Sequence, residues 1–347
     1  MAVSQPVNEA VKQIADTLQK KPRTLWGDAW RRFRKHKMAM FGAITLIFLV
    51  MTSIVGPLLW TVHRDALDFV NVMSTPYFSY PAENEAYCAE QAKLKAEMGE
   101  DPMANTMVDS MCIYHPLGSD ELGRDLLARV LYGGRVSLSV GVSAMLIAVT
   151  IGSLVGAISG YMGGMIDEVL SFFTNLFLSL PTLPLLLLTV YLFRDSVTAV
   201  LGIEFGMFII VVSMVGVLAW MQTARIVRSS FISLKQKEFV EAAVCIGVKQ
   251  SNIMFRHILP NAISPIIVAA TLEIGGAIIS ESTLSFLGIG FPPDTPTWGR
   301  LVTDGSQYLQ TAPHLSLIPA GLIFLTVLSI NFMGDGLRDA LDPRSRL

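Results

Sequence analysis

The stretch that decides the fold reads EFVEAAVCIGVKQSNIMFRHILPN over residues 238–261. It belongs to a polar, net-basic segment, residues 225–260, that lies between two long apolar runs, so it predicts a loop at a membrane surface rather than part of a span. Residues 238–246 can form a short helix, and Gly247 accepts a sharp bend at little steric cost. A second helix over residues 248–257 is then expected to end at Pro260, because proline disrupts a helix interior.

The composition is that of a membrane protein. Of 347 residues, 52% are hydrophobic and 16% are charged, which is too apolar for an ordinary soluble domain. Crossing a bilayer takes about 20 apolar residues. Six segments qualify, and the fold class expected is an all-α membrane protein with six transmembrane helices. Five of these segments are free of charge, and the last is interrupted only by two glutamates: 38–62, 136–166, 169–193, 205–224, 315–334 and 258 to about 290.

Several other classes of protein are disfavoured. The first apolar run is 25 residues long and follows 37 other residues, whereas the apolar core of a cleavable signal has roughly 7–15. The three cysteines are too few for a disulfide scaffold and lack the spacing of a metal site. The sequence has no Gly-x4-Gly-Lys-Ser/Thr phosphate loop and no credible catalytic arrangement of Ser, His, Asp or Cys. We therefore expect neither an enzyme nor a bound metal.

The charges beside the spans predict the orientation. Residues 1–37 hold nine Lys and Arg against three acids, which favours a cytoplasmic N-terminus over the alternative of a tail that binds nucleic acid. The next loop, 63–135, has six Lys and Arg against twelve acids and should lie outside. Counting six spans returns segment 225–260, with six basic residues and two acids, to the cytoplasm. The C-terminus is expected there too.

The outer loop contains the sequence HPLGSDELGRD at residues 115–125. Ser119 is predicted to cap an amphipathic helix on the outer membrane surface. Asp125 and Arg129 would form an i,i+4 pair in this helix, and Gly133-Gly134 would interrupt it before the second span. The earlier part of the loop, 63–115, is given no function, although residues 82–98 could form a short helix.

Two spans carry features of their own. Gly152, Gly156 and Gly160 in the second span form a small-residue ridge that lets another helix approach closely. Pro181 and Pro184 predict a kink or break in the third span. That kink could serve gating or only shape, and the sequence does not separate the two.

Two glutamates lie inside the fifth span. At 1.5 Å per residue from Asn261, Glu273 is about 18 Å along the helix, near mid-membrane, and Glu281 about 30 Å along it, near the outer mouth. Ionisable residues in a span usually face protein or water and serve function. Both are therefore candidates for lining a translocation path. The alternative is a buried hydrogen-bonding anchor, or for Glu281 an interfacial position.

The segment quoted first resembles the "EAA" loop of ABC-importer permeases, the surface on which a cytoplasmic ATPase pushes. The resemblance rests on Glu-Ala-Ala at 241–243, on Gly247 six positions after the glutamate and on the Leu-Pro pair that ends at Pro260. His257 departs from the broad consensus, which prefers Ile there, but HILPN is common in the peptide-importer branch. The implied ATPase-coupling residues are Glu238, Glu241, Ala242, Ala243, Gly247, His257, Leu259 and Pro260.

Segment 115–125 and the tail GDGLRDALDPR at 334–344 also resemble the peptide/nickel family of ABC-importer permeases, so the likeness covers most of residues 35–347. It implies the type I importer architecture, with a basic arm (1–37), a first span (38–62), an outer loop (63–135), a core of five helices (136–334) that includes the coupling loop (225–260), and a tail (335–347). The tail is read as a short cytoplasmic helix closed by Asp-Pro.

The resemblance also implies the partners. They are a homologous second permease, two cytoplasmic ATPase subunits that bind ATP and Mg²⁺, and an external solute-binding protein that docks on outside loops such as 291–313 and 115–135. This chain would bind no cofactor itself. Short peptides are the substrate expected in a bacterial inner membrane. Nickel chelates and oligosaccharides stay open as alternatives within the family, and an ion-driven secondary transporter or a membrane scaffold is the alternative outside it.

The remaining prediction concerns the cysteines. Cys88 and Cys112 fall on the outside, whereas Cys245 lies in the cytoplasmic loop. Disulfides persist outside the cytosol, so only the first two could pair. The alternative is two unpaired thiols.

Overall fold

The computed structural model describes residues 25–60, 62–68, 72–76, 93 and 115–341. Helices account for the regular structure of these residues, apart from one isolated β-bridge between Ser119 and Asp125. Six helical segments are long and apolar enough to cross a membrane, which confirms the fold class. Apart from residue 93, the predicted helix over 82–98 lies outside the described residues, and so do Cys88 and Cys112.

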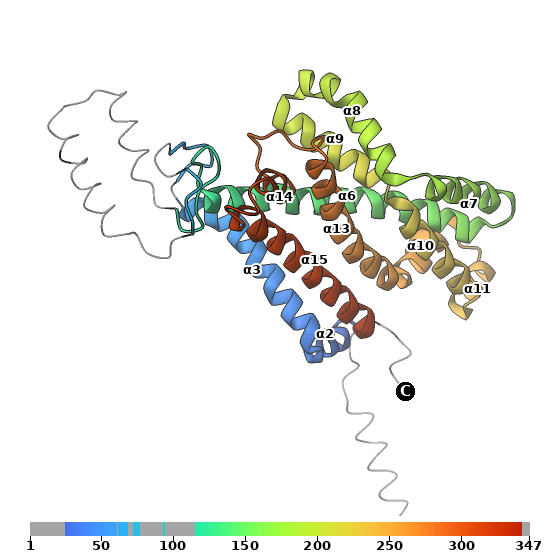
Figure 1. Ribbon diagram of the computed structural model, residues 1–347. Coiled ribbons are helices and arrows are strands. Elements are labelled where there is room, and N and C mark those ends of the chain that lie inside the picture. Colours follow the sequence, from blue (N-terminus) through green and yellow to red (C-terminus); the bar gives the residue numbers. More distant parts are fainter. Residues whose placement is uncertain (1–24, 61, 69–71, 77–92, 94–114, 342–347) are drawn as a thin grey trace, which may run out of the picture.

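From α6 onward the helices follow one another with short connections, whereas residues 60–125 lie between α3 and α6 (Figure 1). Their bounds are α2 Leu25–Lys35, α3 Lys37–Leu59, α6 Leu126–Met162, α7 Gly164–Ser179, α8 Thr182–Leu201, α9 Ile203–Val217, α10 Trp220–Lys235, α11 Glu238–Cys245, α12 Gln250–Asn252, α13 Ile263–Phe286, α14 Trp298–Ser306 and α15 His314–Leu341. Between α12 and α13 lie a π-helical turn, Ile253–Ile258, and a 3₁₀ turn, Leu259–Asn261.

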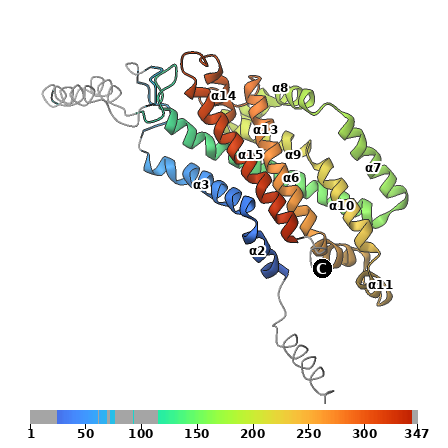
Figure 2. The ribbon, with the colours of Figure 1, turned by 60° about the horizontal axis from the view of Figure 1, so that its bottom comes forward.

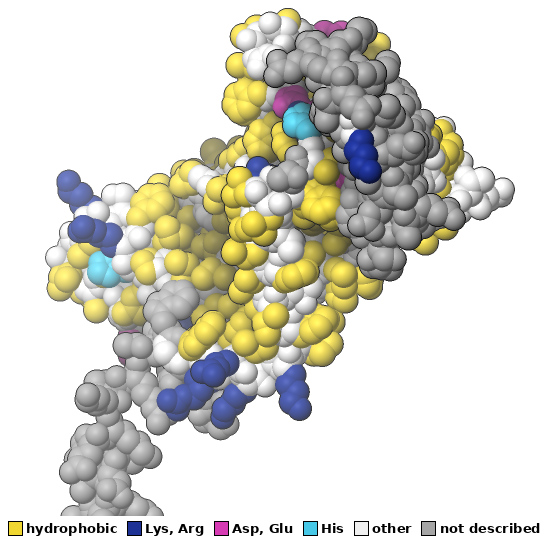
Figure 3. Space-filling model, turned by 90° about the vertical axis from the view of Figure 1, so that its left-hand side faces the viewer, with side chains coloured by type: hydrophobic (Ala, Val, Ile, Leu, Met, Phe, Trp, Pro, Cys, Tyr) yellow, Lys and Arg dark blue, Asp and Glu magenta, His cyan; other side chains and the backbone are white. Residues whose placement is uncertain are grey.

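The central element is α6, which contacts α3, α7, α9, α10, α13 and α14. On one side α3 and α15 run side by side with α13 next to them, and on the other α8 and α9 form a hairpin (Figures 1 and 2). Hydrophobic side chains spread widely over the face drawn in Figure 3, with Lys and Arg side chains mainly at its lower edge, its left margin and its upper right. Such a surface suits a bilayer that is apolar inside and polar at its margins.

The glycine ridge of α6 packs against α10, as the sequence predicted. A Cβ placed on any of its three glycines would lie within 2.6 Å of a backbone carbonyl oxygen of α10, too close for any side chain. The pairs are Gly152 with Trp220, Gly156 with Ala224 and Gly160 with Arg228. The two backbones therefore touch directly, and glycine is required at each contact.

The predictions for the start of the second span were wrong. Helix α6 begins at Leu126 and runs without a break through Gly133-Gly134. The cap is Asp125, whose carboxylate accepts from the Ala128 N–H at 2.8 Å, while Ser119 lies in the preceding turn. The helix continues through these two glycines, whose lack of a side chain makes room for α14. A Cβ on Gly134 would lie 2.9 Å from the ring of Trp298.

Other boundaries also differ from the apolar runs. The third run is broken at Leu180-Pro181, as its two prolines predicted, so α7 and α8 are separate helices. The fourth continues as α10 to Lys235, so the first 11 residues of the predicted loop 225–260 are helical. The tail is no separate helix, because α15 continues to Leu341. The basic arm contains α2, which packs on α15 through Phe33.

Candidate coupling loop and translocation path

The predicted coupling loop is a short helix held on one side and open on the other. Val240 and Ala243 of α11 are buried in a cluster with Val227 and Phe231 of α10 and Ile253, Ile258 and others of the return segment. Large apolar side chains that flank this buried stripe remain exposed in the described chain. Phe239, Val244 and Ile246 are 39%, 58% and 80% exposed. Glu238 and Glu241 lie in the first turn of α11, where the helix dipole favours negative charge.

Gly247 makes the bend that the sequence predicted. Its φ is +76°, a conformation that residues with a Cβ rarely adopt. The Gly247 N–H donates to the Val244 carbonyl at 2.9 Å, and the Val248 N–H donates to the Ala243 carbonyl at 3.1 Å. These two bonds are those of a Schellman motif, which satisfies the last carbonyls of a helix. The bend is thus a specific hydrogen-bonded turn.

The return segment is helical but irregular. Its hydrogen-bond pattern changes from α to π to 3₁₀ between Gln250 and Asn261. Pro260 was predicted to end this helix, yet it lies within the 3₁₀ turn, which runs one residue further. Proline fits there because the α-helical i→i−4 hydrogen bonds are already absent from this turn, so the missing N–H of proline breaks none of them. The Asn261 side-chain amide donates to the His257 carbonyl at 2.6 Å and fixes this turn.

The loop is joined closely to α10 and α6. Only Gln236 and Lys237 separate α10 from α11. Lys235, the last residue of α10, donates to the carbonyl of Tyr161 at 2.6 Å and lies over the ring of that residue. A displacement of α11 therefore acts on α10 directly and on α6 through this contact.

The path candidates occupy different surroundings. Glu273 is half-buried on α13, and Pro181 and Pro184 lie at the break between α7 and α8. Glu281 is fully buried and accepts hydrogen bonds from Ser137 (3.1 Å), Ser285 (2.9 Å) and Thr297 (2.7 Å). These contacts describe a hydrogen-bonded anchor between α6, α13 and α14. Path lining stays a prediction for these residues, and in this conformation the carboxylate of Glu281 reaches no opening.

The outer sequence HPLGSDELGRD holds a cluster of charges that the helical interpretation missed. His115 lies between two carboxylates, 3.1 Å from Asp125 and 3.3 Å from Asp68. Burial alone would lower the pKa of His115, but hydrogen bonds to these carboxylates raise it to about 9. The expected pair of Asp125 with Arg129 is not formed, because Arg129 pairs with Asp120 and Asp125 accepts from Trp60 at 2.8 Å.

Sequence reasoning also missed an ion pair between α7 and α10. Arg228 donates two hydrogen bonds to Asp167, each of 2.6 Å, and the hydroxyls of Ser159 and Ser171 donate to the same carboxylate. From the sequence, Arg228 contributed only to the count of basic residues that predicts the orientation. Among the residues described, no group of three His, Cys, Asp or Glu side chains is placed to hold a metal ion.

Comparison with known proteins gives two family matches. Residues 152–347 match the family of the binding-protein-dependent transport system inner membrane component. Residues 24–79 match the N-terminal TM domain of oligopeptide transport permease C.

Full-length relatives agree with these matches. The chain is 38% identical to the oligopeptide transport system permease protein OppC of Haemophilus influenzae, over 99% of this chain and 98% of the relative. It is 37% identical to the glutathione transport system permease protein GsiD of Escherichia coli, over 93% and 91%. A solved structure of the MetNI methionine ABC transporter in an inward-facing conformation aligns with 19% identity and a TM-score of 0.48, covering 61% of this chain and 96% of that one.

Proposed function

The chain belongs to the family of binding-protein-dependent transport system inner membrane components, and we propose that it carries short peptides across the bacterial inner membrane. It is a multi-pass permease subunit of an ABC importer. Such a permease works with a second permease and with ATPase subunits. In the proposed complex the second permease is a homologue, two ATPases bind on the cytoplasmic side, and a solute-binding protein delivers the peptide outside.

The observation that carries the proposal is the geometry of α11. Its inner side chains anchor it to α10, whereas Phe239, Val244 and Ile246 are exposed to different degrees, from 39% to 80%. Exposed apolar side chains rimmed by charges are typical of a protein interface. An ATPase groove that closes on ATP would displace α11, and the short connection to α10 would pass this motion into the spans.

The arrangement of the ends supports the orientation in this proposal. An even number of crossings returns the chain to the side on which it began. In Figures 1 and 2, α2, α11 and the end of α15 lie toward the same end of the bundle. Arg31, Arg34, Lys35 and Lys37 are exposed at that end, where cytoplasmic loops carry an excess of positive charge. We place both termini in the cytoplasm.

The relatives support this substrate class, because their names specify oligopeptides and glutathione, a peptide-like solute. Nickel chelates and oligosaccharides are the other substrates to test, and an ion-driven carrier is the alternative mechanism. The decisive experiment expresses a tagged chain with its companion subunits and measures both co-purification and uptake. We expect two ATPase chains per complex and peptide uptake that requires ATP hydrolysis.

The charge-reversed variant Glu241→Lys should lose the ATPase from the purified complex, because a reversed charge at a docking surface is repulsive. The matched control is Asp195→Lys, an exposed charge on α8, far from α11. Uptake that persists without the ATPases and collapses with a protonophore would refute the importer mechanism. Uptake of nickel chelates or oligosaccharides in place of peptides would refute only the substrate.

A further inference from the structure

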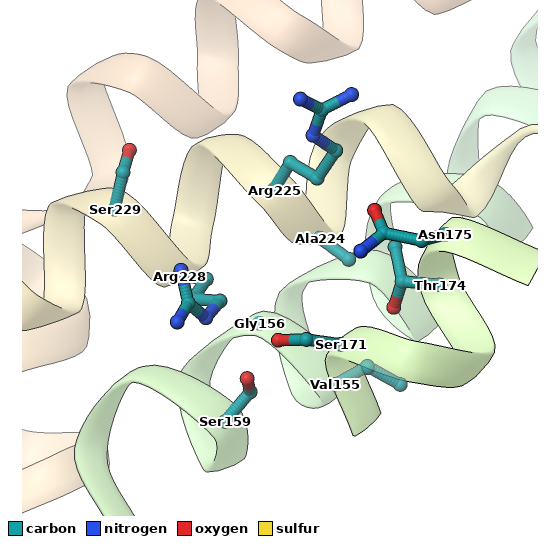
Figure 4. Close-up of a pocket in the computed structure, with 10 residues that line it drawn as sticks. All are labelled: Val155, Gly156, Ser159, Ser171, Thr174, Asn175, Ala224, Arg225, Arg228 and Ser229. Atoms are coloured by element: carbon teal, nitrogen blue, oxygen red, sulfur yellow. The ribbon is translucent and has the colours of Figure 1, made fainter. Parts of the chain in front are cut away.

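A cavity of about 450 Å³ lies between α6, α7 and α10. Seven of its ten lining residues are polar, although the three helices lie in or beside the membrane (Figure 4). Ser159 comes from α6, Thr174 and Asn175 from α7, and Arg225, Arg228 and Ser229 from α10. Small-ligand sites have volumes of roughly 300–1,000 Å³. We call this space the α6–α7–α10 cavity.

The cavity cannot open onto the lipid chains. Asn175, Arg225 and Ser229 are exposed, and an arginine in contact with hydrocarbon is strongly unfavourable. Polar side chains in membrane helices face protein or water instead. Thr174 and Ser159 are buried at the back of the cavity. The lining therefore indicates a polar, water-accessible space, as a hydrophilic solute would need.

The two arginines of the cavity differ in what they are free to do. Arg228 is held by Asp167 through two bonds of 2.6 Å, so its charge is neutralised inside the protein. The side chain of Arg225 makes no hydrogen bond or ion pair with any residue that the structure describes, and its guanidinium lies apart from that of Arg228 in Figure 4. Two arginines against one carboxylate leave one positive charge, on a side chain whose planar fork fits a carboxylate.

The position of the cavity connects it to the coupling loop. Arg225 lies on α10, 13 residues before Glu238, where α11 begins. The opposite wall, α7, follows two residues of positive φ, Gly163 and Gly164, and is tied to α10 by the Asp167–Arg228 pair. A motion of α10 driven by α11 would therefore change the shape of this cavity.

We propose that the α6–α7–α10 cavity is a transient binding site on the translocation path, where Arg225 binds the C-terminal carboxylate of the peptide in transit. This proposal rests on the proposed function. A free peptide carboxylate has a pKa near 3.5 and is ionised at neutral pH whatever the side chains. One arginine in a hydrated space binds it weakly. Such a site would guide peptides of any sequence without trapping them.

The test uses the complete importer in proteoliposomes with saturating binding protein. Initial rates of ATP-dependent uptake are measured for trialanine and for trialanine amide, which lacks the carboxylate. Arg225→Gln should lower the rate for trialanine about fivefold and leave the amide unchanged. Arg225→Lys, which keeps the charge, should retain most of the rate. The matched control is Arg194→Gln on α8, which removes an arginine elsewhere and should affect neither substrate.

A second variant keeps the test decisive where Arg225→Gln does not assemble. Asn175→Asp is nearly isosteric and brings a negative charge to the same cavity, so it should slow trialanine more than the amide. Equal effects on the two substrates, or no effect on either, overturn the proposal while the proposed function stands. Bound phospholipid that is lost from purified Arg225→Gln, with both uptake rates unchanged, would assign the site to lipid phosphate. Failure of the wild-type importer to take up any peptide refutes the proposed function instead.

Discussion

Replacement of Gly247 by valine should uncouple the permease without unfolding it. A Cβ at this position would meet no heavy atom within 4 Å, so the substitution creates no clash inside the chain. The cost is conformational, because φ is +76°. For a residue with a Cβ it amounts to about 1–2 kcal/mol, and more for a β-branched side chain. A penalty of that size shifts the turn away from its Schellman conformation by about 5- to 30-fold.

A conformational penalty of this size predicts that coupling to the ATPase falls stepwise across a series of substitutions. Asparagine tolerates positive φ better than alanine, and alanine better than valine. ATPase recovery with the purified permease, and peptide uptake, should therefore fall in the order Gly, Asn, Ala, Val. The quantity of each variant in the membrane should stay at the wild-type level, because the spans pack without this residue. Quantitative immunoblotting of membranes supplies that reference.

Three results would refute the reasoning. Wild-type uptake by Gly247→Val would show that the bend is not needed for coupling. A series in which asparagine is as damaging as valine would point to a steric contact with the partner, since backbone strain alone ranks the two differently. A loss of protein from the membrane that parallels the loss of uptake would contradict the separation of coupling from folding.

Three further predictions concern the body of the protein. Gly156→Ala should lower the melting temperature in detergent, because its Cβ would lie 2.5 Å from the Ala224 carbonyl oxygen, whereas Gly321→Ala, with nothing within 4 Å, should not; equal melting temperatures would contradict the contact. Glu281→Ala leaves three buried hydroxyls without their acceptor, which costs about 1–3 kcal/mol or more, so the abundance of this variant in the membrane should fall. Glu273→Gln should instead keep its abundance and change the uptake rate. Normal abundance of Glu281→Ala, or reduced abundance of Glu273→Gln with normal uptake per molecule, would contradict these assignments. The pKa of His115 is raised to about 9 in the folded protein, so its ion pairs add about 3 kcal/mol of stability, complete below pH 6.5 and lost as the pH rises through 9. The melting temperature should therefore fall across this pH window in the wild type and not in His115→Gln. A wild-type melting temperature that stays flat, or the same pH dependence in His115→Gln, would argue against the pairing.

The sequence predicted the features that local chemistry controls. The apolar runs at 38–62 and 315–334 became α3 and α15 because span length and hydropathy are properties of the run itself. Gly247 was found for the same reason, since only its own φ is at issue. The glycine ridge of α6 was also visible in its spacing, although its partner, α10, was not.

The errors came from contacts between distant residues. Gly133-Gly134 suggests an interruption of the helix in the sequence alone. Its role is to leave space for Trp298, which lies more than 160 positions later in the chain. Asp167 and Arg228 are 61 residues apart, and nothing in either neighbourhood announces that they meet. The three hydroxyls that surround Glu281 were likewise not visible in the sequence, which left path lining and a buried anchor both open for this residue. Such pairings depend on the tertiary fold, which periodicity does not encode.

The uninterrupted course of α6 has a mechanical consequence. Its 37 residues make a rod about 55 Å long, nearly twice the roughly 30 Å of the hydrocarbon layer. One end is fixed in the cluster around Asp125, and the other is held by Lys235 at Tyr161. Because the helix has no break, it can tilt as a rigid body. A tilt of roughly 10° about one end moves the other end by about 10 Å. A rigid-body tilt of α6 therefore moves the surfaces of this subunit at both ends of the helix together.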